Sequence, residues 1–470
     1  MKIKIVGAAG GEVTGSAYFV QTENAKLLVD AGMFQGGKKS EGKNRLPTGV
    51  SLSTLDAVLL THAHLDHTGR VPLLIKHGYT GRIYATAATI ELAELILQDS
   101  ARLQLYEAER ANRVRHFSRQ GPVEPLYSPK DVLPFRQMGR GVQFREPVEV
   151  AKGISARWIE AGHILGSASI ELTVTEQDRT TIVLFSGDLG PIGRPIIRDF
   201  ERPSQADIVF LEATYGDRDH RSYSDTIAEF EDLVKHAAEA RGKILVPTFA
   251  IGRAQLMLYH LAVMFHRGVV KPFHVYLDSP MAIEASKEMV THPELFDEEL
   301  LEWKSRGLLP LDKTWFHASV TPRDSQSLND VEGPCLILAG AGMCNGGRIL
   351  HHLRHGLPRD NTHVLIVGYQ SRGSLGRRLI EGSESVSIFG EKVSVRAKVN
   401  TLGGFSAHAG RSDLLKWFAP LAASRPQIII THGEDAPRQK LSAVIRERFG
   451  LGSQLPSQGN IVEISAPVVS

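Results

Sequence analysis

The sequence has few cysteines, no strong excess of either charge and no long apolar run, and each absence narrows the possibilities. Two cysteines in 470 residues, Cys335 and Cys344, are too few for a disulfide framework, so we expect a reducing, cytoplasmic setting. A net charge of +2 gives no sign of a nucleic-acid partner. Every apolar run is shorter than the ~20 residues that cross a membrane, and the start, MKIKIVGAAGGE, lacks the apolar stretch of a signal peptide. We therefore expect no membrane association.

The length and composition are typical of a globular protein with more than one domain. At about 150 residues per domain the chain allows two or three domains, and 42% hydrophobic and 23% charged residues are ordinary values. Short apolar runs and turns fill the first half. From Tyr223 strands alternate with helices, and the end of the chain returns to the first style. This order predicts a helix-covered parallel sheet inserted into a first domain that resumes near the C-terminal end.

Local patterns give the expected elements around the first candidate site. Ala57–Thr61 is predicted to be a strand and Ala87–Leu105 a helix. The helix runs into a charged stretch from about Gln98 to Gly141, which we interpret as a solvated helix followed by a connector.

The strongest chemical signal is the motif Thr-His-Ala-His-Leu-Asp-His at residues 61–67, directly after the expected strand. In an extended segment residues two apart point the same way, so His62 and His64 can bind one ion. Asp66 and His67 follow a turn and can face a second ion. Imidazole and carboxylate ligands suit zinc, with manganese or iron as alternatives. A histidine-rich surface loop is the alternative to a metal site, and buried groups of this kind would be costly without a ligand.

Other apolar strands end on a carboxylate or an imidazole, which would complete two coordination shells. These residues are Asp30, His163, Asp188, Glu212 and His432. Taken singly, each of them could be an ordinary loop residue. Ligands from distant segments that gather at the carboxyl edge of a sheet are typical of active sites on such folds. His408 is a weaker candidate, because it could instead cap the expected helix Arg411–Phe418.

Together these motifs resemble the metallo-β-lactamase superfamily. The order of its ligand motifs is matched by Asp30, residues 62–67, His163 and Asp188. The inserted block resembles the β-CASP branch of nucleic-acid nucleases, whose three further motifs are matched by Glu212, His408 and His432. The strings DSPMA, AGMCNGGR and GSLGRR are similar to stretches of that branch. The likeness is greatest to compact RNA endonucleases related to the endonuclease subunit of the cleavage and polyadenylation specificity factor.

The resemblance implies an α/β fold, a metallo-β-lactamase αββα sandwich with an inserted β-CASP domain whose parallel sheet is flanked by helices. The first part of the sandwich would span residues 1–213 and the β-CASP domain residues 214–404. Residues 405–470 would complete the sandwich.

The resemblance also implies two Zn²⁺ per chain, with Mn²⁺ as the alternative. One zinc would be held by His62, His64 and His163, and the second by Asp66, His67 and His432. Asp188 would bridge both, and Asp30 would support the ligands from behind unless it is only a structural turn residue. Asp66, His408 and Glu212 are the residues assigned to catalysis, with His408 as the general acid and Glu212 orienting it.

By the same resemblance the protein would be a zinc-dependent hydrolase of RNA phosphodiester bonds, acting in RNA processing or decay. Histidine at position 432 favours RNA over DNA as the substrate, because the motif that it matches resembles valine in the DNA-repair branch. Single-stranded RNA would lie between the domains, with phosphate contacts from Arg253, Arg348, Arg372 and Arg377. These arginines could instead face solvent, and GYQSRGSLGRR departs from the expected pattern around Arg372.

Some alternatives stay open at this point. Cleavage could be endonucleolytic, 5′–3′ exonucleolytic or both, and the chain could form a homodimer. Two other functions compete with the ribonuclease: a metallohydrolase of a small ester or thioester, and an inactive scaffold paralogue that binds RNA. The first would not need a block of about two hundred residues as a clamp. The second would be expected to lose ligands, and every expected ligand is present.

Overall fold

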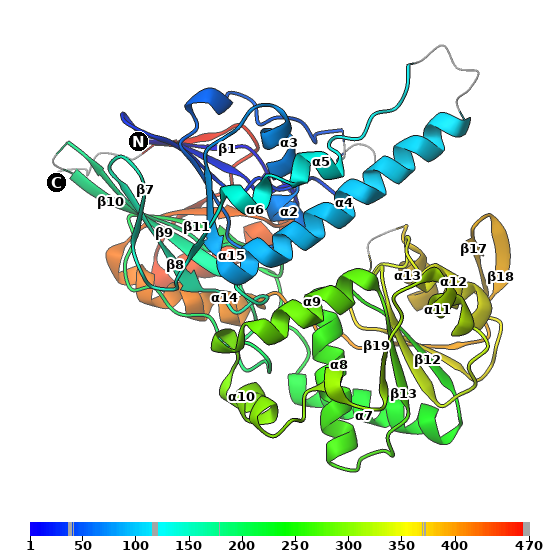
Figure 1. The fold of residues 1–470 in the computed structure, drawn as a ribbon. Helices are drawn as coiled ribbons and strands as arrows, with labels where there is room; N and C mark the ends of the chain where they lie inside the picture. Colours follow the sequence, from blue (N-terminus) through cyan, green and yellow to red (C-terminus); the bar gives the residue numbers. More distant parts are fainter. Residues whose placement is uncertain are drawn as a thin grey trace. The chain divides into compact units, whose positions relative to one another are not determined.

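The computed structural model describes residues 1–35, 40, 42–114, 121–177, 179–368, 370 and 373–463. The chain divides into two compact units (Figure 1). Unit 1 comprises residues 1–193, 199–219 and 408–470, and unit 2 comprises residues 194–198 and 220–407. Unit 2 is thus inserted into unit 1, because the chain passes from unit 1 into unit 2 and then returns to unit 1.

Unit 1 contains two seven-stranded sheets. The strands of the first sheet, in order across it, are β22 (Ile461–Glu463), β1 (Lys2–Ile5), β2 (Tyr18–Gln21), β3 (Lys26–Val29), β4 (Ala57–Leu59), β5 (Arg82–Thr86) and β6 (Gly139–Val142). Those of the second sheet are β21 (Ser453–Gln454), β20 (Gln427–Thr431), β11 (Ile208–Glu212), β10 (Arg179–Phe185), β9 (Ala168–Glu176), β8 (Ile154–Glu160) and β7 (Val148–Ala151).

Because side chains alternate between the two faces of a strand, each sheet packs against the other sheet on one face and against helices on the opposite face. In β11, Ile208 and Phe210 join a buried cluster built from both sheets, which includes Trp158. Val209 and Leu211 point to the opposite face, where helices α14 (Arg411–Phe418) and α15 (Asp435–Phe449) cover the second sheet. On the first sheet the long helix α4 (Ala87–Val114) packs against β5 and β6. The result is the αββα sandwich that the resemblance to the metallo-β-lactamase superfamily implies.

Shorter helices complete unit 1 and position its loops. They are α2 (Leu65–Thr68), α3 (Val71–Lys76), α5 (Pro129–Val132) and α6 (Phe135–Met138). The α2 helix carries the second half of the histidine motif, and α3 follows it after one turn.

Unit 2 is built on a six-stranded sheet whose described strand pairs are all parallel. Its strands in order are β14 (Phe316–Ala318), β13 (His274–Asp278), β15 (Cys335–Ala339), β12 (Lys243–Pro247), β16 (Thr362–Ile366) and β19 (Lys398–Thr401), and β17 (Ser385–Ile388) pairs with β18 (Glu391–Ser394). Its helices are α7 (Tyr223–Glu239), α8 (Arg253–His266), α9 (Pro280–Thr291), α10 (Glu298–Ser305), α11 (Pro322–Ser327), α12 (Ile349–Gly356) and α13 (Leu375–Ile380). The fully buried residues of β12 and β15 explain their continuous apolar runs.

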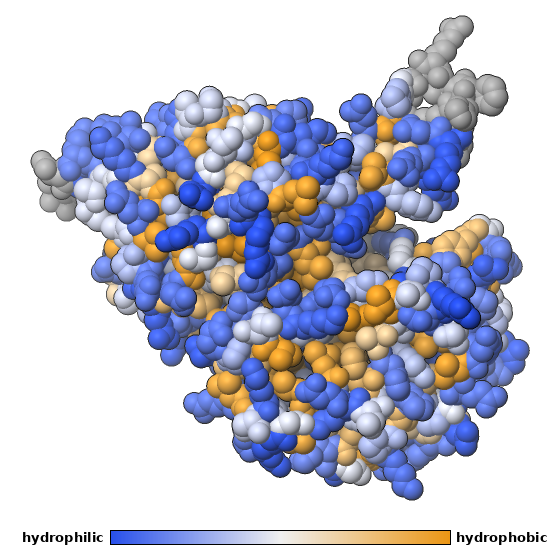
Figure 2. Space-filling model, in the orientation of Figure 1, coloured by the Kyte–Doolittle hydropathy of each residue, from blue (hydrophilic) through white to orange (hydrophobic). Residues whose placement is uncertain are grey.

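The described helices include none that is both long enough and apolar enough to span a membrane. On the face drawn in Figure 2, hydrophilic residues predominate on each unit, with smaller hydrophobic groups among them.

Candidate metal centre

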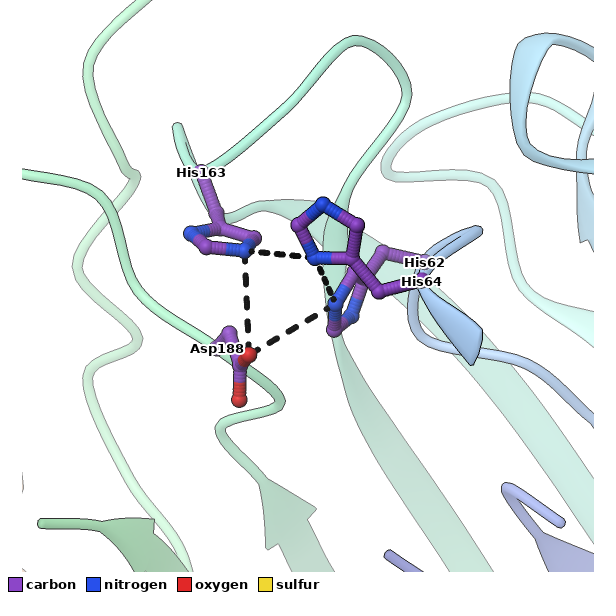
Figure 3. Close-up of side chains that lie close together, drawn as sticks. All are labelled: His62, His64, His163 and Asp188. Carbon is purple, nitrogen blue, oxygen red and sulfur yellow. Dashed lines mark hydrogen bonds and ion pairs between the residues drawn. The ribbon is translucent and has the colours of Figure 1, made fainter. Parts of the chain in front are cut away.

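Three histidines and one aspartate of unit 1 come together where their strands end. His62 and His64 follow β4, His163 follows β8 and Asp188 follows β10. Their side chains point toward one another (Figure 3). His64 Nδ1 lies 3.1 Å from His62 Nε2 and 3.1 Å from His163 Nε2. Asp188 Oδ2 lies 3.6 Å from His62 Nε2 and 3.7 Å from His163 Nε2.

These separations have the size that a four-coordinate ion requires. With metal–ligand bonds of about 2.0–2.1 Å, the ligand atoms of a tetrahedral site stand about 3.3–3.4 Å apart. The four measured distances, from 3.1 to 3.7 Å, bracket this value. Direct hydrogen bonds would explain the two short distances between nitrogens but not the convergence of all four atoms. The first cluster therefore fits a metal ion.

A second cluster lies beside the first and uses the other half of the motif. His67 Nε2 is 3.2 Å from His432 Nε2, and Asp66 Oδ2 is 3.6 Å from His432 Nε2. Asp66 and His67 lie on α2, and His432 follows β20. All three ligand atoms lie within 4.8 Å of one another. This is again the spacing of ligands around one ion.

Asp188 stands between the two clusters. Its Oδ2 atom belongs to the first, whereas Oδ1 lies 3.3 Å from His67 Nε2 and 3.5 Å from His432 Nδ1. The side chain is 2% exposed, and Oδ1 has no hydrogen-bond partner among the residues that the structure describes. A buried carboxylate oxygen without a partner is costly, and a cation beside it would remove that cost. The donor set thus fits ions on both sides of Asp188.

Asp30 holds the second cluster from behind. Its Oδ2 accepts a hydrogen bond from His67 Nδ1 at 2.7 Å, and its Oδ1 accepts one from the Thr61 backbone N–H at 2.9 Å. The Thr61 hydroxyl also donates to Oδ2 at 2.9 Å. With its proton on Nδ1, His67 presents the lone pair of Nε2 to the cluster, as metal-binding histidines commonly do. Asp30 thereby fixes the tautomer of His67.

The two clusters differ electrostatically. Burial lowers the pKa of His62 well below its usual value and that of His64 to about 4, so both rings are neutral at pH 7, the form that binds metal. Around His67 burial acts in the same direction, but the charges of Asp188 and Asp30 outweigh it and raise the pKa. The second cluster thus sits in a field that stabilises positive charge.

His408 and Glu212 lie at the edge of the centre. His408 Nδ1 is 3.6 Å from Glu212 Oε1 and 3.8 Å from Asp188 Oδ2. The buried Glu212 carboxylate accepts hydrogen bonds from the Leu189 N–H at 2.8 Å and the Thr214 N–H at 3.1 Å. Burial lowers the pKa of His408, yet the nearby carboxylates of Glu212 and Asp188 raise it overall. His408 therefore favours the protonated form, which can serve as an acid.

Two threonines of the metal centre are not among the residues predicted from the sequence. Thr61 binds Asp30 as described, and Thr214 Oγ1 lies 3.2 Å from His432 Nδ1, where it orients that ring. Their only signal is a hydroxyl residue just after a buried strand, which is too common to single them out.

Comparison with known protein families gives three matches along the chain. A model of the metallo-β-lactamase superfamily matches residues 10–248, about half of the chain. The chain belongs to the metallo-β-lactamase superfamily. A β-CASP domain model matches residues 254–379, and a Zn-dependent metallo-hydrolase RNA specificity domain matches residues 392–456. Membership of this superfamily implies a metal-dependent hydrolase that uses divalent metal ions, in agreement with the clusters of unit 1.

Individual relatives extend along the whole chain. "Ribonuclease TTHA0252" of Thermus thermophilus is 39% identical over 99% of this chain and 98% of its own length. "Transcription termination factor FttA" of Cenarchaeum symbiosum is 30% identical over 95% of this chain and 68% of its own length. A crystal structure of a protein of unknown function from Enterococcus faecalis aligns over 98% of this chain with a TM-score of 0.54 at 12% identity, which shows that the two share a fold.

The four arginines predicted to contact phosphate have different surroundings in unit 2. Arg348 donates hydrogen bonds to the buried Asp278 carboxylate at 2.7 Å and to the carbonyl oxygens of Ser319 and Val320, so its guanidinium is held within unit 2. Arg377 pairs with Glu381 at 2.7 Å on an exposed helix face. Arg253 donates to the Phe405 carbonyl at 3.3 Å. Arg372 lies outside the described residues.

Proposed function

We propose that this protein is a zinc-dependent ribonuclease that hydrolyses phosphodiester bonds of single-stranded RNA. The placement of Asp188 between two histidine clusters carries the proposal, because paired metal ions are a common solution for phosphodiester hydrolysis. The full-length relative named as a ribonuclease and the RNA specificity domain supply the substrate class. The complete set of ligands disfavours an inactive scaffold.

The two clusters would hold two Zn²⁺, with Mn²⁺ as the alternative. His62, His64 and His163 would bind one ion and Asp66, His67 and His432 the other, with one Asp188 oxygen directed to each. When bound, such a pair of ions would supply a water molecule of lowered pKa and stabilise negative charge on the phosphoryl oxygens. Nitrogen and carboxylate ligands at tetrahedral spacing favour zinc.

A residue of this chain would supply the proton that the leaving oxygen needs. The departing ribose oxygen needs a proton, because an alkoxide is a poor leaving group. His408 is the residue placed to give it: Nδ1 faces Glu212 and Asp188, which keep the ring protonated, and Nε2 on the opposite side of the ring would donate. Glu212 acts through His408 as a positioning residue, fixed in turn by two backbone N–H groups.

Other parts of the proposal are independent of the centre. Arg253 and Arg377 remain proposed phosphate contacts of unit 2. Two buried free cysteines, Cys335 and Cys344, are consistent with a cytoplasmic location. A homodimer is a prediction that sedimentation velocity would test.

Cleavage of labelled RNA tests the proposal. The purified protein is incubated with a single-stranded RNA labelled at either end and with DNA of the same sequence, before and after chelation. We expect cleavage of RNA that is lost with chelation and restored by zinc, and fragments of intermediate length would identify endonucleolytic cleavage. The His64→Ala variant should be inactive, whereas His77→Ala, which removes an exposed histidine of the same unit, should be active. Hydrolysis of small esters without cleavage of RNA would contradict the proposal.

A further inference from the structure

Unit 1 has a second cavity, separate from the metal centre and lined by cations. It has a volume of about 360 Å³ and lies between β1, the segment 43–48 and the turn before β22. Four basic side chains line it: Lys4, Lys43, Arg45 and Arg70. Among the described residues that line this cationic pocket, none is an aspartate or a glutamate.

Arg70 is the most constrained of these cations. It is 2% exposed, and its guanidinium donates hydrogen bonds to the carbonyl oxygens of Gly32, Gly15 and Arg45. Within the described part of the chain all three acceptors are neutral, and no ion pair joins Arg70 to a carboxylate. Burial lowers the pKa of Arg70 to about 10. A buried cation usually has an anionic partner, whereas the described partners of Arg70 are neutral: the three carbonyl oxygens and the ring of Phe34, whose centroid lies 5.0 Å from the guanidinium carbon.

The other three cations leave the pocket strongly positive. Lys4 Nζ donates to the Thr48 carbonyl at 2.9 Å, which is again a neutral acceptor. Lys43 pairs with Glu12, the one carboxylate in contact with this group of side chains in the described residues. The Arg45 side chain is exposed, and the described residues offer it no ion pair. Only one of four positive charges is therefore balanced.

The size and walls of the pocket indicate what anion would fit. About 360 Å³ is more than a single inorganic phosphate needs and lies at the lower end of the range for small-molecule sites. Guanidinium and ammonium groups together suit phosphate oxygens. The walls also include apolar side chains, among them Leu46 and Pro47, which offer a surface for a less polar group. A phosphate joined to a ribose and a base has both properties.

We propose that the cationic pocket binds a nucleoside phosphate, with its phosphate among Lys4, Arg45 and Arg70 and its base or ribose against Leu46 and Pro47. The phosphate could belong to a free nucleotide or to a nucleotide unit of an RNA strand, since both present the same chemistry. The site uses none of the residues of the metal centre, so it can be tested independently of the proposed ribonuclease activity.

The test is calorimetric titration of the full-length protein with adenosine 5′-monophosphate, with and without chelation. Removing one charged partner of a phosphate weakens binding by about ten- to a hundredfold. We expect this loss for Lys4→Ala and for Arg45→Ala, each with an unchanged circular dichroism spectrum. Lys2→Ala is the matched control, because Lys2 lies on the same strand but pairs with Glu463 at 2.9 Å. We expect Lys2→Ala to bind as the wild type does.

The outcomes separate the alternatives. Binding that persists after chelation and in His64→Ala but falls in the Lys4 and Arg45 variants supports the pocket. Displacement of the nucleotide by a 2′-O-methyl RNA strand would then identify RNA as the source of the phosphate, and no displacement would identify a free nucleotide. Binding that disappears with chelation and is unchanged in the Lys4 and Arg45 variants, or no binding at millimolar nucleotide, would overturn the proposal.

Discussion

The substitution Asp30→Asn tests how the fold prepares the second metal cluster. The carboxylate accepts hydrogen bonds at both oxygens: Oδ1 from the Thr61 backbone N–H and Oδ2 from His67 Nδ1. An asparagine has one acceptor and one donor group at these two positions. If its NH₂ group faces the Thr61 N–H, two donors oppose each other. If it faces His67, the ring must accept at Nδ1 and carry its proton on Nε2, the nitrogen that faces the cluster.

Either arrangement weakens the second cluster and leaves the first intact. Loss of such a supporting hydrogen bond typically lowers metal affinity 10- to 100-fold, or about 1.4–2.7 kcal/mol. Asp30 makes no described hydrogen bond to His62, His64 or His163 itself. It is linked to His62 only through the Thr61 hydroxyl, which lies 3.1 Å from His62 Nδ1 and keeps an oxygen acceptor in either arrangement of the asparagine, so the affinity of the first ion should stay within the wild-type range. We thus expect one of two zinc affinities to fall and the other to be unchanged.

The assay is zinc titration in competition with a chromophoric chelator, which resolves the two affinities. Asp56→Asn is the matched control, because Asp56 also accepts a backbone N–H, from Lys26 at 2.8 Å, but is exposed and outside the centre. Wild-type affinities at both sites in Asp30→Asn would refute the reasoning. So would an equal loss at both sites in a variant whose circular dichroism spectrum is that of the wild type.

Two further predictions concern the proposed general acid, His408, and a buried carboxylate of unit 2, Asp278. His408→Ala should lower kcat for RNA cleavage by about 10²–10⁴ while the protein retains both metal ions by elemental analysis, and loss of an ion would show that His408 is a ligand instead. For Asp278, burial raises the pKa, but hydrogen bonds from His352, Ser325 and Arg348 outweigh this and lower it. A lowered pKa in the fold means stability that is present above the unfolded value of about 4 and lost as the pH falls. Asp278→Asn should therefore destabilise unit 2 at pH 7, by roughly 3 kcal/mol, and thermal melts should show less additional loss in the variant than in the wild type between pH 5 and pH 3.

The residues of the metal centre could be predicted from the sequence because they lie in recognisable local patterns. The His62–His67 motif and the strands that end on Asp188, Glu212 and His432 follow from composition and periodicity alone. Strand pairing brings them together: β10, β11 and β20 are parallel neighbours, so their carboxyl ends share one edge. The assignment of ligands to two ions came from the resemblance and not from the pattern, because spacing does not show how carboxylate oxygens are directed.

Where the structure differs from the predictions made from the sequence, each difference has an identifiable physical cause. The strand predicted as Ala57–Thr61 ends at Leu59, since the Thr61 N–H bonds to the Asp30 carboxylate and not to a neighbouring strand. Helix α4 continues to Val114, beyond the predicted Leu105, because no proline or glycine interrupts this charged run and its side chains are solvated. The role of Arg348 depends on a buried carboxylate 70 residues earlier in the chain, which local sequence cannot reveal.

The central claim is that two metal ions lie on either side of Asp188. Anomalous diffraction at the zinc edge, from crystals of the protein grown with zinc, tests it most directly. We expect two peaks, one bound by His62, His64 and His163 and the other by Asp66, His67 and His432. A single peak, or peaks away from Asp188, would contradict it.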